Sequence, residues 1–127
     1  MYVCPSILYT ADDTILQSLI RKHAVELLCR DEPHSPFTNV PTKDEVQSFD
    51  KDKGLCCTAD SFRLDFGDVP SSAWNTSATH VFTASFRDTH PGCQRSAKEI
   101  FAAFVVHFRY LRKVYEQQQE VARVAQE

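Results

Sequence analysis

The last quarter of the chain carries an apolar stripe whose spacing only a long amphipathic helix satisfies. Large apolar side chains recur there at alternating intervals of three and four residues, at Phe101, Phe104, Phe108, Leu111 and Tyr115. Ile100 and Val105 widen the stripe to the roughly 100° of helix surface that packs against a globular core. The pattern predicts a helix over residues 97–125 that packs against the rest of the chain.

A capping box marks the start of this helix. The Ser96 hydroxyl can accept a hydrogen bond from the backbone N–H of Glu99, while the Glu99 carboxylate accepts one from the N–H of Ser96. At 1.5 Å per residue the helix would be roughly 43 Å long, which exceeds the diameter of a small domain. We therefore expect one helical domain over residues 1–115 and a polar helical extension over residues 116–127, whose end can fray.

The N-terminal third predicts another helix followed by a loop. Between Ala11 and Cys29 the apolar residues follow helical spacing. Asp12 and Asp13 lie where the dipole of such a helix favours acids. The three prolines of residues 30–41 then end the helical pattern and predict a loop.

The middle of the chain is less regular. Thr42 and Glu45 form a second capping box, which predicts a short helix to about Asp52 that ends before Gly54. In residues 55–69 apolar and polar side chains alternate over a few positions, but the sequence offers no partner for a lone strand. We expect this segment to be irregular with an extended piece.

A third helix is predicted over residues 75–88, with Ser72 or Asn75 as its N-cap. Its large and small apolar residues share one face: Trp74, Ala78, Val81, Phe82 and Phe86. Nine phenylalanines and a single methionine indicate a core built largely from aromatic rings. Together these patterns predict a mainly α fold: a small single-domain irregular helical bundle with a long C-terminal helix and an acidic irregular middle segment.

Charge and hydropathy exclude several functional classes. The net charge is −3, with a net −5 over residues 31–68 and +2 over residues 94–127, which gives no general attraction to nucleic acid or an anionic membrane. No run approaches the roughly 20 apolar residues that span a bilayer, and the first residues lack the basic and apolar regions of a secretion signal. We expect an intracellular protein, of the cytoplasm or nucleus, without membrane contacts.

The cysteines offer the one candidate metal site. Five cysteines cannot all pair within one chain, so in a reducing compartment buried thiols are the alternative interpretation. Zinc needs four ligands, which commonly arrive as close pairs. The candidate ligands are Cys56, Cys57, His90 and Cys93. Because only His90 and Cys93 have the two-residue gap of a zinc knuckle, we expect no metal and no other cofactor.

No catalytic motif is recognisable in the sequence. The chain has three glycines and therefore no Gly-rich phosphate-binding loop or dinucleotide fingerprint. Its cysteines and histidines supply nucleophile and base pairs only by coincidence. The acids of residues 44–52 alternate with lysines as on a solvated helix face, and His107 lies between core positions that favour a structural histidine. We expect that the protein is not an enzyme.

The remaining candidate site is a group of cations on the long helix. Arg112 and Lys113 follow Arg109 by three and four residues, so the three cations share one helical side, with Tyr110 beside them. There they can meet phosphates or the acidic surface of a partner protein. The alternative is a solvated face whose bases pair with Glu116 and neighbouring acids.

The middle half of the chain resembles a group of short fungal proteins. The resemblance is carried by the segment of residues 56–66, by Pro70-Ser-Ser-Ala-Trp-Asn75, and by Val81, Phe82 and Phe86. These positions are similar to a pattern in short proteins from mushroom-forming fungi, some of them encoded near mobile elements. No activity is established for that group, so the resemblance implies no functional residue. It implies an intracellular, element-encoded protein with an interaction or nucleic-acid-associated role.

Three functions follow as hypotheses. We expect a non-enzymatic intracellular protein-interaction module, monomeric or weakly dimeric, because the net charge is negative and the basic cluster is small. The first alternative is a nucleic-acid-associated accessory protein of a mobile element that uses the basic face of the C-terminal helix. The second alternative is a Cys/His hydrolase or a zinc module.

Overall fold

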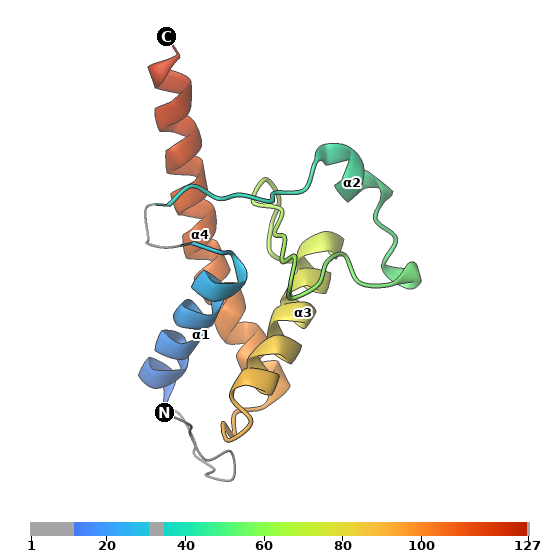
Figure 1. The fold of residues 1–127 in the computed structure, drawn as a ribbon, viewed down its shortest axis with the longest axis vertical. Helices are drawn as coiled ribbons and strands as arrows, with labels where there is room; N and C mark the ends of the chain where they lie inside the picture. The colour runs from blue at the N-terminus through green and yellow to red at the C-terminus, as the bar shows by residue number, and fades with distance from the viewer. Residues whose placement is uncertain (1–11, 31–34, 127) are drawn as a thin grey trace.

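The computed structural model describes residues 12–30 and 35–126. Within them the chain forms four α-helices, one 3₁₀ helix and no strand, in the order α1 (Asp13–Leu27), α2 (Lys43–Ser48), η1 (Lys51–Lys53), α3 (Ala73–Thr89) and α4 (Ala97–Ala125). α1 and α3 both pack against α4, while α2 and η1 project to one side of α3 (Figure 1). The predicted mainly α fold with a long C-terminal helix is confirmed.

α1 begins and ends through local hydrogen bonds. Asp12 is the N-cap, and its carboxylate accepts a hydrogen bond from the first turn at 2.8 Å. At the other end Cys29 adopts a left-handed conformation with φ 54°, so that the N–H of Arg30 reaches the carbonyl of Val25. Glycine usually occupies this closing position because a side chain is disfavoured there. Of the predicted loop that follows, residues 35–41 contain no helix or strand, and residues 31–34 lie outside the described part.

The predicted second helix is divided in two. The capping box of Thr42 and Glu45 is present, with hydrogen bonds of 2.9 and 3.1 Å. However, α2 is only six residues long, and η1 follows as a separate turn that ends at Gly54. The helix breaks because the backbone of Phe49 is extended, which brings its ring edge-on against Trp74 with 5.5 Å between the centroids.

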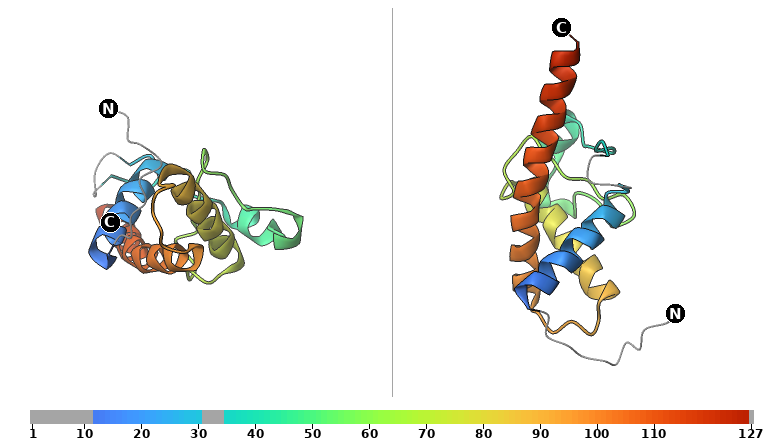
Figure 2. Two further views of the ribbon diagram at one scale, coloured as in Figure 1. Left: turned by 90° about the horizontal axis from the view of Figure 1, so that it is seen from below. Right: turned by 90° about the vertical axis from the view of Figure 1, so that its left-hand side faces the viewer.

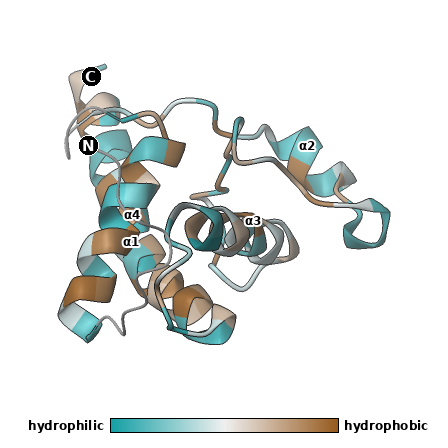
Figure 3. Ribbon diagram, turned by 60° about the horizontal axis from the view of Figure 1, so that its bottom comes forward, coloured by the Kyte–Doolittle hydropathy of each residue, from teal (hydrophilic) through white to brown (hydrophobic). Residues whose placement is uncertain are grey.

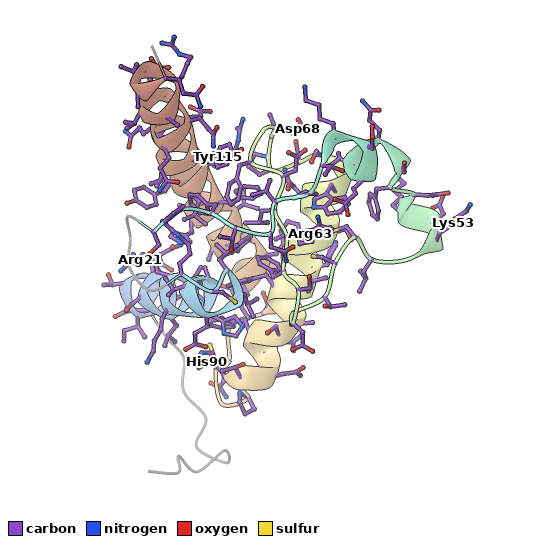
Figure 4. The ribbon with its side chains drawn as sticks, turned by 45° about the horizontal axis from the view of Figure 1, so that its top comes forward. Arg21, Lys53, Arg63, Asp68, His90 and Tyr115 are labelled. Atoms are coloured by element: carbon purple, nitrogen blue, oxygen red, sulfur yellow. The ribbon has the colours of Figure 1, made fainter. Side chains whose placement is uncertain are left out.

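A bidentate ion pair joins α2 to the irregular segment of residues 55–69. Both terminal nitrogens of Arg63 donate to the carboxylate of Glu45 at 2.7 Å. The guanidinium of Arg63 holds the pKa of Glu45 at about 2, well below its ordinary value. Figure 4 shows Arg63 at the base of the projecting part and Lys53 at its outer end.

The irregular segment of residues 55–69 covers one side of the core. Phe62, Leu64 and Phe66 are each at most 2% exposed, whereas Arg63 and Asp65 between them are partly exposed. The alternation therefore marks an extended stretch with one buried face, as expected, although it pairs with no strand in the described residues.

α3 begins at Ser72, which resolves the choice of N-cap. The Ser72 hydroxyl accepts a hydrogen bond from the backbone N–H of Asn75 at 3.2 Å. Asn75 lies inside the first turn and is fully buried. Its side chain is therefore free to bond the neighbouring irregular segment rather than its own helix.

α4 agrees with the sequence pattern over its whole length. Ser96 and Glu99 form the expected capping box, with hydrogen bonds of 3.1 and 3.0 Å. The helix then runs for 29 residues to Ala125. Its last three turns are mostly exposed and extend beyond the other helices (Figures 1 and 2). The division into a domain over residues 1–115 and an extension over residues 116–127 stays a prediction.

The core is a stack of phenylalanine rings between α1, α3 and α4. Phe104 of α4 lies nearly parallel to Phe82 of α3, with 4.1 Å between the ring centroids, and contacts Phe62 edge-on at 6.2 Å. From α1, Leu16 and Ile20 close the cluster. Figure 3 shows hydrophobic and hydrophilic residues interspersed along these helices, as expected of amphipathic helices that bury one face. None of the described helices is long and apolar enough to span a membrane.

Truncation of Phe104 tests whether this stack is the centre of the fold. Its ring is fully buried, so Phe104→Ala should lower the free energy of unfolding by roughly 3 to 5 kcal/mol in urea denaturation. Val106 of the same helix is 55% exposed, and Val106→Ala should change stability by less than about 0.5 kcal/mol. A loss below about 1 kcal/mol for Phe104→Ala would contradict this core assignment.

Candidate functional site

The three predicted cations of α4 line one groove. This cationic groove, of about 840 Å³, runs between α4 and the segment that leads into α3. Its walls combine apolar and charged side chains: Val69, Pro70, Ser71, Thr76, Phe101, Val105, Arg109, Arg112, Lys113 and Glu116. The helical spacing that grouped Arg109, Arg112 and Lys113 in the sequence therefore places them on one surface, as expected.

The three cations differ in how firmly they are held. Arg112 is partly buried, and its Nε donates to the backbone carbonyl of Phe66 at 3.3 Å. Arg109 and Lys113 are exposed, and within the described residues neither is within ion-pair distance of an acid. Of the alternative, the solvated face is observed at Arg109 and Lys113, whereas an ion pair with Glu116 is not observed among the described residues, although Glu116 lines the same groove. Two charged groups remain available for a ligand.

Phe101 and Val105 form an apolar strip beside these cations. Both side chains are partly exposed, and the ring of Phe101 rests on His80 of α3 with 4.9 Å between centroids. Val105 lies one helical turn before Arg109 and Phe101 lies two turns before it, on the same face. The groove thus offers a ligand both an apolar surface and positive charge.

The opposite wall of the groove is held by the side chain of Asn75. Its amide nitrogen donates to the carbonyls of Asp65 and Val69 at 2.9 and 3.0 Å, and its oxygen accepts from the N–H of Asp65 at 2.8 Å. The side chain of Asn75 is fully buried, and an amide left unpaired there would be costly. The three hydrogen bonds fix the loop that carries Val69 and Pro70 against α3.

Tyr110 does not belong to this site. One residue along a helix turns the side chain by about 100°, so Tyr110 points away from Arg109 and toward α1. There it lines a second, smaller pocket, which we call the helix pocket, of about 310 Å³. The structure therefore does not bring Tyr110 together with the three cations in one groove. Tyr115, the last residue of the predicted apolar stripe, stacks on Phe66 with 5.0 Å between the ring centroids (labelled in Figure 4).

His107 forms part of the lining of the helix pocket. It is 8% exposed and stacks against Tyr110, with 5.9 Å between the ring centroids. Burial, together with the positive charges of Arg21 and Arg30, lowers its pKa to about 4. The imidazole is therefore neutral at physiological pH, as expected of a histidine at the edge of a core.

The candidate zinc ligands lie at opposite ends of α3. Cys56 contacts the carbonyl of Trp74 near the start of this helix, and its sulfur lies 3.6 Å from that of Cys57. His90 is the C-cap at the other end and forms a turn with Cys93. Seventeen residues of helix separate the two pairs by roughly 25 Å. No cluster of three or more metal-ligating side chains occurs in the described part of the chain.

The pKa of the Cys57 thiol is lowered. The S–H of Cys56 donates to the Cys57 sulfur, and a backbone hydrogen bond with Arg63 and the charge of its guanidinium also lower the pKa of Cys57. The same contact, together with burial, raises the pKa of Cys56. Cys57 is 8% exposed, and no thiol bonds a histidine ring among the described side chains. The arrangement is that of a buried structural pair.

Sequence reasoning missed a buried contact between His23 and Ser85. Nε2 of His23 lies 2.9 Å from the Ser85 hydroxyl, while Nδ1 is buried without a hydrogen bond and lies 3.9 Å from the carboxylate of Glu26. The arrangement of Ser85, His23 and Glu26 resembles a catalytic triad. However, Ser85 lies within α3, and neither Ser85 nor His23 lines the cationic groove or the helix pocket. The spacing of three residues between His23 and Glu26 is visible in the sequence. It carries no information about Ser85, which lies on another helix.

Comparison with known proteins adds no family to this geometry. No protein-family model, curated protein or solved structure matches the chain.

The buried state of His107 predicts how stability depends on pH. Because its pKa falls from 6.5 to about 4 on folding, the unfolded chain binds a proton between these pH values and the folded chain does not. This contribution to stability is present above about pH 6.5 and is lost as the pH falls toward 4. We expect a loss of about 2 to 3 kcal/mol from this residue, measured by urea denaturation at several pH values.

Two variants separate this contribution from that of the carboxylates. His107→Gln removes the titration and should make the decline in stability with falling pH shallower than in the wild type. His80→Gln replaces an exposed histidine and should leave the decline unchanged. Equal declines in His107→Gln and the wild type would contradict the assignment.

Proposed function

We propose that this chain is a non-enzymatic, intracellular protein-interaction module whose cationic groove binds an acidic, partly apolar segment of a partner protein. The observation that carries the proposal is the joint presence of Arg109 and Lys113 with Phe101 and Val105 along one groove. Affinity in protein interfaces comes from buried apolar anchors, and complementary charge steers the encounter and fixes its register.

The state of the groove supports a ligand of that composition. The exposed cations are not neutralised by acids of the described chain, so an acidic partner gains their attraction without breaking an existing ion pair. The partly exposed Phe101 and Val105 gain burial when they are covered by apolar side chains. A partner strand or helix that alternates acids with large apolar residues satisfies both.

A nucleic-acid-associated role, as in an accessory protein of a mobile element, is the second candidate. It is favoured by the same exposed pair, Arg109 and Lys113, which can contact phosphates, and by the resemblance to proteins encoded near such elements. Phosphate recognition makes no use of the apolar strip, and three cations release few counterions. For these reasons we rank it second. The cysteines carry no proposal, because the two candidate pairs are separated by the length of α3.

Binding of a synthetic peptide tests the first candidate. We expect a peptide that alternates Glu with Leu and Phe to bind in fluorescence anisotropy, and Lys113→Glu to weaken it about tenfold because attraction becomes repulsion. Val105→Ser, which removes apolar surface and leaves the charge unchanged, should weaken it about threefold. Lys53→Glu makes the same change of charge on η1, at a residue that does not line the groove, and is the matched control (Lys53 is labelled in Figure 4).

Single- and double-stranded oligonucleotides in the same assay decide between the candidates. Oligonucleotide binding that falls steeply with salt, is lost in Lys113→Glu and is unaffected by Val105→Ser would favour the nucleic-acid role and overturn the first proposal. Peptide binding that Lys53→Glu weakens as much as Lys113→Glu would show that total charge, and not the groove, is responsible.

We further propose that the chain is a monomer or a concentration-dependent dimer. The exposed end of α4 carries Val121 and Val124, which are 69% and 53% exposed, but too few large apolar residues to hold a coiled coil. Sedimentation velocity over a range of concentrations should show monomer at the lowest. A dimer that survives dilution and disappears on deletion of residues 116–127 would contradict this expectation.

A further inference from the structure

We propose that the helix pocket between α1 and α4 is a binding site for a small amphipathic carboxylate, with the apolar tail on its floor and the carboxylate at its cationic rim. This site lies on the α1 side of α4 and is independent of the cationic groove, which lies between α4 and the segment before α3. Its lining includes Tyr110 and His107, neither of which lines the cationic groove.

The shape and lining of the pocket fit a small, largely apolar molecule. A volume of about 310 Å³ is at the lower end of the range for small-molecule sites, roughly 300 to 1,000 Å³. The floor is formed by Ala24, Val25 and Leu28 of the α1 side and Leu111 of α4. Val25 and Tyr110 are 37% and 55% exposed, so an apolar tail would cover surface that water now contacts.

The described charged residues that line the pocket all have the sign that favours an anion. Arg21 and Lys22 of α1 and Arg30 just beyond it contribute to the lining, and among residues 12–30 and 35–126 no acid does. Arg30 is mostly occupied: its guanidinium donates to the carbonyl of Ser35 at 2.9 Å and covers the ring of Phe37. Arg21 and Lys22 are exposed, and therefore supply the rim that a carboxylate would meet.

The positive potential of these arginines extends to His107 in the lining of the pocket. The charges of Arg21 and Arg30 both lower the pKa of its imidazole, in addition to the larger effect of burial. A field that disfavours a cation at His107 stabilises an anion in the same place. The imidazole of His107 and the phenol of Tyr110 supply polar atoms near the rim. The side chains of the floor supply none of the polar atoms that a sugar or a nucleotide would need.

Titration with sodium octanoate, followed by ¹H–¹⁵N NMR of the full chain, tests the site. We expect saturable shifts at Val25 and Tyr110 with a dissociation constant below about 1 mM. 1-Octanol has the same tail without the charge, and should bind at least about fivefold more weakly because it gains nothing from Arg21. Bound octanoate should also raise the pKa of His107, followed through its ring C–H signals.

Two single-charge variants show whether binding is local. Arg21→Gln should weaken octanoate about threefold to tenfold and leave octanol unchanged. Lys53→Gln removes one positive charge from η1, remote from the pocket, and should leave octanoate binding unchanged. Octanol binding as tightly as octanoate, no saturable shift up to about 10 mM, or equal losses in the two variants would each overturn the proposal.

Discussion

The buried amide of Asn75 is the interaction on which much of the molecule depends. An isolated irregular segment has no helix or sheet ladder to satisfy its backbone, and here the side chain of Asn75 takes that role with three hydrogen bonds to Asp65 and Val69. With the N–H and carbonyl of Asp65 paired in this way, the neighbouring side chains of Leu64 and Phe66 lie in the core, together with Phe62. The irregular segment thereby closes one side of the core that α1, α3 and α4 form.

The same constraint shapes the surface. Val69 and Pro70 stand opposite α4 because the loop that carries them is fixed to the first turn of α3. The hydrogen bond from the guanidinium of Arg112 to the carbonyl of Phe66 joins α4 to the same irregular segment. The long helix supplies the charges, and the irregular segment supplies the wall that turns a helix face into a groove.

The parts of this structure that sequence reasoning predicted are those encoded within one helix. The capping box of Ser96 and Glu99, the apolar stripe of α4 and the common face of Arg109 and Lys113 depend on spacings of three and four residues, which a sequence displays directly. Tyr110 was misplaced because a neighbour in sequence is about 100° away on the helix surface. The groove, the helix pocket and the contact of His23 with Ser85 all form where separate elements pack together. Local sequence patterns carry no information about such packing.

The position of Asn75 also bears on where this chain can be made. Asn75, Thr76 and Ser77 spell an acceptor sequence for N-linked glycans, which are attached to the side-chain nitrogen of asparagine. That nitrogen is fully buried and donates two hydrogen bonds that hold the core closed. A sugar at this position and the native fold exclude one another, so passage through a glycosylating secretory pathway would set modification in direct competition with folding.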